Sequence, residues 1–404
     1  MKKIRFFGLL FVLAMACVFL LASCAGMTAA KAADKAPVAE HALDELDDED
    51  HDDHDDQPDY GRLLVHSLDG SLIMLDAYDG DILFTEQQAL PAGSAVLYAG
   101  KTGEVGYAFG QDHRRAAIVD SGYILMLHGG HHDLVTNRAS LVGTFEAELV
   151  PDNFYSDGRF AYAADRDEGR VLRLNEVSVR SFTQVPSIDT LEYDRTVAAS
   201  PAIDAAAAYG GELLYVLPDG LLLLPVSAKA ERMADVRRLG RTLAFPAEHG
   251  RNPLVFTVAA NFLRPSAVIG LMDDSGYWLL SYNFDTKALS SRQLPVMPLQ
   301  LAYDPFGTYL IMLGADYVLY SLDPQTFAIK KTFNLVDHGF IVAADDLPLA
   351  ALTLGTRYGW LTNPAAPALV QVDLSTLQVN TTWALPAGSL PDALVLLKTV
   401  GEKH

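Results

Sequence analysis

The sequence predicts an all-β protein, a β-propeller of seven blades with an eight-bladed ring as the alternative, preceded by a disordered N-terminal tether. Three observations lead to this prediction. Short β segments separated by turn residues fill the chain from about residue 60, one strand-end motif returns at intervals typical of propeller blades, and the segment before residue 60 has no apolar periodicity.

Composition limits the class of protein and the class of ligand. The chain has 404 residues, of which 50% are hydrophobic and 20% charged, so it is apolar enough to form a folded core. The formal net charge of −21 argues against nucleic acid as a partner, because phosphate binding requires a basic surface. Both cysteines, Cys17 and Cys24, lie near the N-terminus, so a metal site in the folded domain must use His, Asp or Glu.

Residues 1–23 have the pattern of an export signal rather than of a folded segment. Basic residues near the start precede an apolar run over residues 6–21, and the Leu-Ala-Ser-Cys sequence ending at Cys24 resembles a bacterial lipobox. This pattern predicts an extracytoplasmic protein, periplasmic or on the cell surface, whose membrane contact is a lipid anchor on Cys24. The alternative is ordinary signal cleavage near Ala22 or within residues 29–33.

Residues 24–59 are predicted to form a flexible acidic tether. Within it, residues 44–56 contain ten acidic residues around His51 and His54, and His41 lies just before them. Such a block repels itself and cannot bury apolar surface. It is either a solubilising spacer or a weak, exchangeable site for a divalent cation, and the histidines favour zinc, copper or nickel over calcium.

The domain predicted over residues 60–400 begins with a β-meander. Strands are expected over residues 62–66, 71–77 and 81–86, with turns at Asp69-Gly70 and Asp79-Gly80. The strand-end motif, an apolar-x-apolar segment closed by a turn residue, then returns every 40 to 58 residues. Its seven positions are Asp76, Asp120, Asn175, Pro225, Asn283, Asp323 and Asp373.

This interval fits a blade of four strands, and blades bury their faces only by closing into a ring. The closing strand is expected over residues 393–397, paired with the first meander. A β-sandwich is the structural alternative, but its turns should come every 8 to 12 residues without the longer recurrence.

The densest group of metal-binding residue types is the segment from His128 to Asp133, which reads His-Gly-Gly-His-His-Asp. In an extended strand His128 and His131 would lie on opposite faces, so a shared ion requires the chain to fold between them. The two glycines permit that fold, and a strand continuing from His131 would place Asp133 on the same side. This supplies too few donors for zinc, so a distant ligand is required.

His249 is the best candidate for that distant ligand. It lies in a loop between Pro246 and Gly250, whereas His66 lies within an apolar strand and is predicted to be a core or face residue. His113 lies beside two arginines, which disfavours cation binding, and His338 follows Asp337 in a turn at the surface.

These segments together resemble the AztD family of periplasmic zinc metallochaperones. The resemblance is carried by the acidic tail, residues 118–122, the His128–Asp133 motif, the Pro246–Gly250 loop, and residues 359–374. It implies a propeller whose zinc ligands include His128, His131 and His249, with Glu148 standing where the family has another His. Gly130 and Phe245 depart from the family pattern, which has Asp and Cys at these places.

The predicted function is therefore capture of zinc and its transfer to the solute-binding protein of a zinc ABC importer, with binding rather than catalysis as the mechanism. The predicted metal donors are His128, His131, His249, Glu148 and Asp133, with weaker donors at His41, His51 and His54 in the tail. Two other classes stay open: a lipid-anchored propeller scaffold for protein contacts, and a metal-dependent hydrolase with Glu248 as its base.

Overall fold

The computed structural model describes the chain from Gly61 to Leu397, except for short internal stretches. The stretches outside the described residues are 101–102, 104, 112–114, 129–130, 137–138, 147–152, 157–159, 166–169, 176–187, 193–203, 210–211, 218–219, 226–240, 247–248, 250–252, 262, 339, 341–348 and 364. The predicted signal segment and tether, including Cys24, His41, His51 and His54, lie outside the described residues.

The described residues form seven four-stranded antiparallel sheets and one two-stranded sheet. This confirms the predicted propeller and gives seven blades. The strands of the first four blades, from inner to outer edge, are β30 (Pro391–Leu397), β1 (Arg62–Ser67), β2 (Leu72–Asp76) and β3 (Ile82–Glu86); β4 (Ala95–Ala99), β5 (Val105–Gly110), β6 (Arg115–Asp120) and β9 (Ser140–Glu146); β10 (Asn153–Ser156), β11 (Phe160–Asp165), β12 (Arg170–Asn175) and β13 (Ile188–Glu192); β14 (Asp204–Tyr209), β15 (Glu212–Leu217), β16 (Gly220–Pro225) and β17 (Arg241–Ala244).

The remaining three blades follow the same order. Their strands are β18 (Leu254–Ala260), β19 (Ser266–Asp273), β20 (Gly276–Asn283) and β21 (Leu289–Leu294); β22 (Pro298–Tyr303), β23 (Leu310–Gly314), β24 (Val318–Leu322) and β25 (Ile329–Asn334); β26 (Leu352–Leu354), β27 (Tyr358–Asn363), β28 (Ala368–Asp373) and β29 (Gln378–Ala384). The two-stranded sheet consists of β7 (Tyr123–His128) and β8 (His131–Thr136), and a 3-10 turn, η3, covers Val336–His338.

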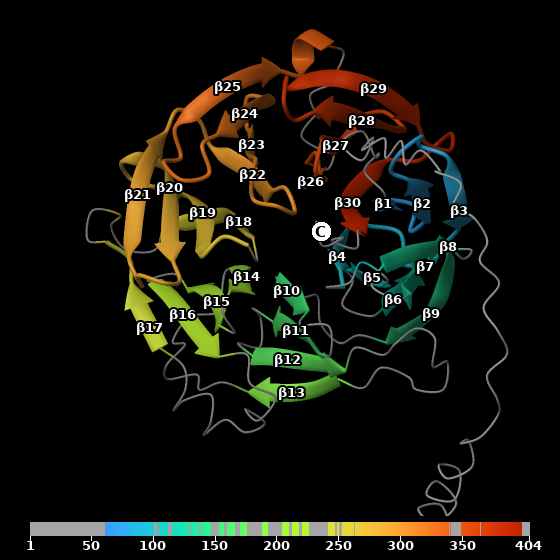
Figure 1. Ribbon diagram of the computed structural model, residues 1–404, viewed down its shortest axis with the longest axis horizontal. Coiled ribbons are helices and arrows are strands. Elements are labelled where there is room, and N and C mark those ends of the chain that lie inside the picture. Colours follow the sequence, from blue (N-terminus) through green and yellow to red (C-terminus); the bar gives the residue numbers. More distant parts are fainter. Residues whose placement is uncertain are drawn as a thin grey trace, which may run out of the picture. The chain divides into compact units, whose positions relative to one another are not determined.

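The blades are arranged in a ring around a central axis (Figure 1). Their innermost strands contact one another in the order β10, β14, β18, β22, β26, β30 and β4. Each blade is a meander, so its connection from the first to the second strand lies at the same end as the connection from the third to the fourth. The turn between the second and third strands, and the link to the next blade, lie at the opposite end.

The two ends of the folded chain meet in the first blade. The C-terminal strand β30 pairs with β1, with Leu63 opposite Leu396 and His66 opposite Ala393. This confirms the closing strand expected over residues 393–397. Because β30 completes a sheet begun by β1, the ring is closed by strand hydrogen bonds rather than by packing alone.

The seven strand-end motifs all mark the end of a third strand. The Asp323 carboxylate, for example, accepts hydrogen bonds from the backbone N–H groups of Gln325 and Thr326 at 2.9 and 2.7 Å. Asn283 and Asp373 bind the amides two and three residues on in the same way. These residues satisfy the backbone of the turn that leads to the outer strand, which is why Asp and Asn recur there.

The hydrophobic core lies between neighbouring blades. One cluster joins Leu63 and Ile73 of the first blade to Trp360 and Leu369 of the seventh, and comparable clusters join the first to the second, the fourth to the fifth, the fifth to the sixth and the sixth to the seventh. Central strands such as β1 are buried on both faces, since a neighbouring blade covers each side. No described blade therefore buries its faces without its neighbours.

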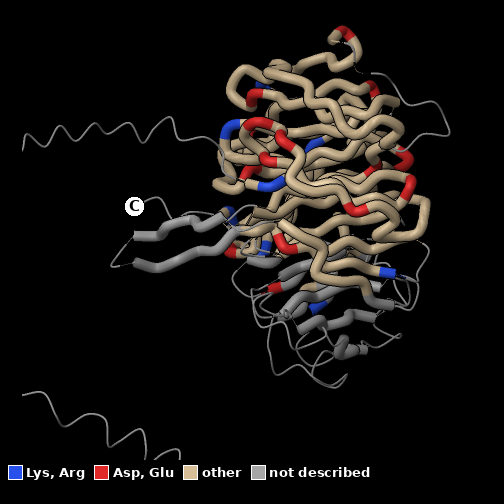
Figure 2. The backbone as a smooth tube through the Cα atoms, turned by 90° about the vertical axis from the view of Figure 1, so that its right-hand side faces the viewer, with Lys and Arg blue, Asp and Glu red and all other residues tan. Residues whose placement is uncertain are grey.

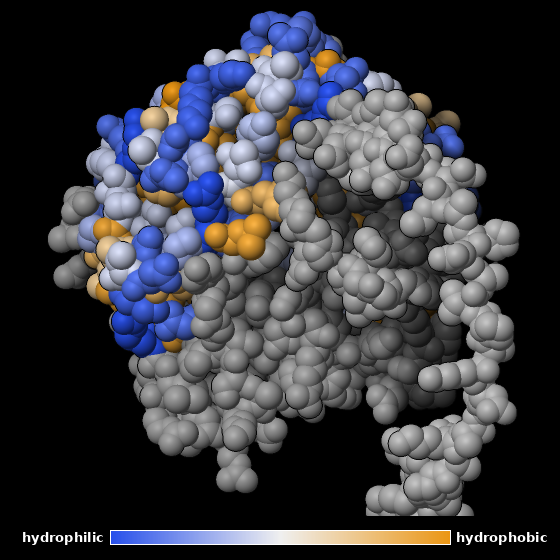
Figure 3. Space-filling model, in the orientation of Figure 1, coloured by the Kyte–Doolittle hydropathy of each residue, from blue (hydrophilic) through white to orange (hydrophobic). Residues whose placement is uncertain are grey.

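Polar residues gather where the strands end. Figure 2 shows many of the Asp and Glu residues in turns at the two ends of the strands, as expected when the strands themselves form the core. The described part of the face in Figure 3 is mostly polar, with apolar residues in small groups. Among the described residues, no helix has the length and apolar character needed to cross a membrane.

Candidate metal-binding site

His249 is the predicted metal-binding residue whose side chain the structure describes in full. It lies in the connection between β17 and β18, which links the fourth blade to the fifth, and only 1% of its surface is exposed. Its Nδ1 lies 3.1 Å from Oδ2 of Asp273, the last residue of β19. The loop position predicted for His249 is therefore correct, and its side chain is buried and held against the next blade.

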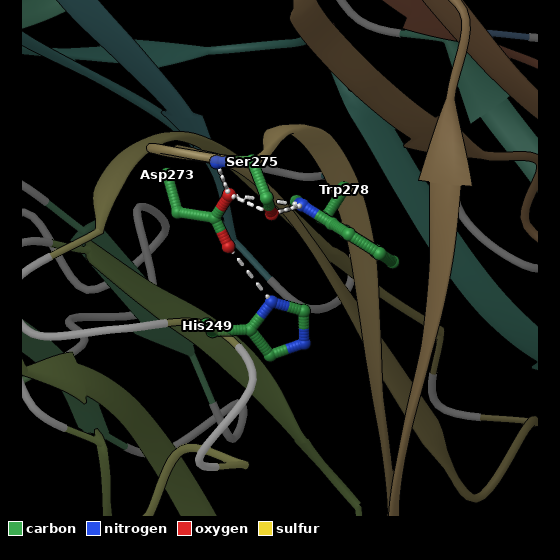
Figure 4. Close-up of polar contacts among 4 residues, drawn as sticks. All are labelled: His249, Asp273, Ser275 and Trp278. Atoms are coloured by element: carbon green, nitrogen blue, oxygen red, sulfur yellow. Dashed lines mark hydrogen bonds and ion pairs between the residues drawn. The ribbon is translucent and has the colours of Figure 1, made fainter.

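Asp273 connects His249 to two further residues (Figure 4). Its Oδ1 accepts hydrogen bonds from the backbone N–H of Ser275 at 2.8 Å, from the Ser275 hydroxyl at 2.5 Å, and from Nε1–H of Trp278 at 3.1 Å. The Trp278 ring meets the imidazole edge to face, with ring centroids 5.0 Å apart. The group joins the link between two blades to the turn between β19 and β20.

Opposing effects act on the pKa of the Asp273 carboxyl. Burial raises it, but the hydrogen bonds from the Ser275 hydroxyl and amide, from His249 and from Trp278 together outweigh burial and hold this pKa below its usual range. Asp273 is therefore a carboxylate at neutral pH, and it acts as the acceptor in each of these contacts.

The other ring nitrogen of His249 has a different environment. Nε2 is buried and has no hydrogen-bond partner among the residues that the structure describes. In Figure 4 this nitrogen lies on the side of the ring away from Asp273. A buried polar nitrogen without a partner is costly unless an ion or a water completes it, so Nε2 is a candidate donor to a metal ion.

The structure brings His128 and His131 together in the backbone register. They are direct Cα partners at the end of the β7–β8 hairpin, and Asp133 pairs with Met126. The sequence required the chain to fold between the two histidines, and the antiparallel pairing of β7 with β8 agrees with that requirement. Their side chains, and Glu148 between β9 and β10, lie outside what the structure describes.

The hairpin and His249 leave the blades at opposite ends. The β7–β8 hairpin is inserted between the third and fourth strands of the second blade, whereas His249 lies in a link between blades. Each hairpin strand has six residues and spans about 20 Å, the same as a blade strand of that length. Among the described side chains, no three of His, Cys, Asp and Glu form a metal-binding cluster.

The predictions for the remaining histidines can be compared with the structure in two cases. His66 is fully buried within β1, and its Nδ1 lies 2.6 Å from Oδ1 of Asp392, which agrees with the predicted core position. His338 is exposed in η3, as expected for a surface turn. His113 lies outside the described residues.

Sequence reasoning missed Asp273, Ser275 and Trp278. The only signal was a polar Asp-Asp-Ser-Gly turn directly after an apolar strand, which is an ordinary hairpin pattern. Nothing in the sequence pairs that turn with a histidine 24 residues earlier.

Comparison with known proteins agrees with the fold. Two structures of AztD from Citrobacter koseri, one of them the apo protein, match with TM-scores of 0.67 and 0.66 at 16% and 15% identity. They cover 85% and 83% of this chain, and 100% and 97% of the AztD chains. A protein of unknown function from Desulfotomaculum acetoxidans matches with a TM-score of 0.55 at 11% identity, over 84% of this chain and 99% of its own.

At these identities the likeness shows the fold, and the chain has an AztD-like propeller. The sequence matches no protein-family model and no curated protein.

Proposed function

We propose that this protein is an extracytoplasmic zinc metallochaperone, which captures zinc and passes it to the solute-binding protein of a zinc ABC importer. The AztD-like fold supports this role, because the sequence motifs around His128 and His249 resemble that family of zinc chaperones. The mechanism is binding and transfer of an ion, and zinc is the cargo rather than a reagent.

The observation that carries the proposal is the Nε2 atom of His249. It is a buried imidazole nitrogen without a partner among the described residues, on a ring whose other nitrogen faces a carboxylate. Zinc-binding histidines are commonly held in this way, with one nitrogen on the metal and the other on a carboxylate. The donor set thus fits zinc, which prefers neutral imidazole nitrogen.

The remaining donors in this proposal are His128, His131, Asp133 and Glu148. The first two are direct Cα partners in the hairpin register, so a site that uses one of them is expected to use both. Together with His249 and one carboxylate they complete four-coordinate zinc. The proposal is one tight site shared by the hairpin and the β17–β18 connection.

The tail supplies a second, weaker group of donors in this proposal. His41, His51 and His54 lie among or beside ten carboxylates, and a tether gives them a high effective concentration near the tight site. A lipid on Cys24 would hold the protein at a membrane surface outside the cytoplasm. The tail collects zinc and loads the site, and the loaded protein meets its partner there.

A competitive zinc titration of the full chain and of a His249→Gln variant tests the site. We expect one tight ion per wild-type chain and a loss of affinity of more than about 100-fold in the variant, since loss of a mere supporting partner already costs 10–100-fold. His338→Gln is the matched control, because it removes an exposed imidazole, and it should bind as the wild type does.

The His128→Ala variant tests whether the hairpin shares the site. A shared site predicts that this variant and His249→Gln weaken the same single ion. The shared site would be contradicted if the wild type bound two ions and each variant lost a different one of them. Wild-type affinity in His249→Gln would contradict the proposed function.

Deleting residues 41–56 tests the tail. The expected result is slower zinc loading and slower transfer to a solute-binding protein, with the stoichiometry of the tight site unchanged. Unchanged rates in the shortened protein would remove the tail from the mechanism.

A further inference from the structure

Hydrogen-bond donors surround the Asp273 carboxylate on both of its oxygens. Oδ1 receives the Ser275 amide, the Ser275 hydroxyl and the Trp278 indole N–H, and Oδ2 faces Nδ1 of His249. Only 5% of the side-chain surface is exposed. Oδ1 accepts three hydrogen bonds and Oδ2 faces the imidazole, so the geometry favours Asp273 as a partner of His249 over a direct donor to an ion.

The contact between Asp273 and His249 dictates where the imidazole proton lies. A carboxylate can only accept a hydrogen bond, so Nδ1 of His249 must carry the proton. In a neutral ring, Nε2 then has the lone pair. The opposite tautomer would place the Nδ1 lone pair against Oδ2 at 3.1 Å, which is repulsive, and would leave a buried N–H at Nε2 without an acceptor among the described residues.

Trp278 and Ser275 fix the position of the Asp273 carboxylate through hydrogen bonds. Trp278 donates to both Asp273 and the Ser275 hydroxyl, each at 3.1 Å. Its ring also packs against His249 at an interplanar angle of 77°, which opposes a flip of the imidazole. The turn that carries these residues contains Gly276 at φ of +135°, so its backbone is specialised for this geometry.

We propose that Asp273 is the positioning residue of the zinc site: it fixes His249 as the Nδ1–H tautomer and thereby makes Nε2 the metal-binding atom. This inference rests on the proposed function for its consequence, but the tautomer itself is a property of the metal-free protein. Asp273 acts through His249 and does not contact the ion.

Nitrogen NMR of the metal-free full chain, labelled with 15N-histidine, tests the tautomer directly. The His249 signals are assigned by their absence from the His249→Gln spectrum. The expected result is a protonated Nδ1 and an unprotonated Nε2 in the wild type. In Asp273→Asn the carboxamide can donate to Nδ1, so the population of the other tautomer should rise.

Zinc titration of the same proteins measures the consequence. Asp273→Asn should bind zinc about 10–100-fold more weakly, as other losses of supporting carboxylates do. Asp337→Asn is the matched control, because it makes the same substitution at an exposed 3-10 turn, η3, outside the His249–Asp273 group, and the tautomer should not change. Its zinc affinity should stay within about threefold of the wild type.

The possible outcomes separate the positioning role of Asp273 from the proposed function. A neutral His249 that is protonated on Nε2 instead of Nδ1 in the wild type would overturn the positioning role. This measurement is made on the wild type, and the only variant it needs is His249→Gln, which assigns the signals. Unchanged zinc affinity in a folded Asp273→Asn protein, with His249→Gln impaired, would also overturn it. Wild-type affinity in His249→Gln would instead overturn the proposed function and leave the tautomer result standing.

Discussion

Two buried His–Asp pairs have the same chemistry but occupy different kinds of structure. His66 and Asp392 lie on paired strands at the seam where the ring closes, and Oδ2 of Asp392 also accepts the backbone N–H of Ala95 in the next blade at 3.0 Å. His249 and Asp273 join a link between blades to a hairpin turn. In both pairs the distal Nε2 has no partner among the described residues.

The difference lies in what surrounds each pair. The seam pair is enclosed by packed strands, with apolar side chains of the first and second blades around β1, so its contacts serve the closure of the ring. The His249 pair is at the end of the strands, between a link that connects two blades and a hairpin turn. The same two residue types therefore serve ring closure in one place, whereas in the proposed function the carboxylate of the other pair supports an imidazole that binds the ion.

The largest expected effect is on stability at the seam. Asp392→Ala leaves both His66 and the Ala95 amide without their acceptor, and breaking a buried pair of this kind costs about 3–5 kcal/mol. Chemical unfolding measures the loss. A double-mutant cycle with His66→Ala should show strong coupling between the two residues, and additive effects would mean that the pair does not hold the seam.

Gly80 provides a second test of the seam. Its φ is +80°, and an added Cβ would lie 2.5 Å from the Trp383 ring of the seventh blade. Gly80→Ala should cost about 2–4 kcal/mol, from left-handed backbone strain and overpacking. Gly388→Ala is the control, because its φ is +89° but nothing lies within 4 Å of the added atom. An equal loss in both would mean that contact with Trp383 contributes nothing.

At the other pair, Asp273→Ala should cost less in stability, about 1–2 kcal/mol, because Ser275, which donates two of the lost hydrogen bonds, is exposed and can bond to water instead. Its effect on zinc affinity should be large by comparison. Unfolding and zinc titration of both variants compare the two pairs directly. Asp392→Ala should lower the free energy of unfolding more than Asp273→Ala does, and Asp273→Ala should lower zinc affinity more than Asp392→Ala does. The reverse order would contradict the assignment of the two roles.

The smallest effect is expected at a turn remote from both pairs. A 2.8 Å contact with Lys330 and the amides of Thr326 and Gln325 hold the pKa of Asp323 far below its usual value near 3.8. A lowered folded-state pKa adds stability that is present above about pH 4 and is lost as the pH falls.

Asp323→Asn can still cap the turn, so at pH 7 it should lose less than about 1 kcal/mol, as expected for an exposed pair. Its unfolding free energy should also fall less steeply between about pH 4 and pH 2. Lys330→Met should also weaken the dependence of the unfolding free energy on pH in this range. A dependence equal to that of the wild type in both variants would mean that other groups cause the acid sensitivity.

Much of the fold follows from local pattern. Apolar runs and Asp-Gly turns define the first strands. Asp or Asn stands at the end of most third strands, and where its contacts are described it caps its own turn, so the motif predicts a blade. The closing strand was predictable because residues 393–397 are apolar and the ring needs a partner for β1.

Local sequence pattern predicted less of the candidate site than of the fold. The sequence singled out His128, His131 and His249 as residue types that bind metals, and it indicated that the chain must fold at Gly129-Gly130. It gave no reason to select Asp273, since an Asp at a strand end is common in this chain and most such residues only cap turns.

By itself, the sequence determined the all-β ring, its blade period and the residue types available for a metal, because each depends on side chains near one another in the chain. The closing strand followed from a second requirement, that a closed ring supplies a partner for β1. Only the tertiary structure decided which histidine is buried against which carboxylate. His66 meets Asp392 across 326 positions, and His249 meets Asp273 across the boundary between two blades. Such contacts depend on how blades pack and how the ring closes, which no local pattern encodes.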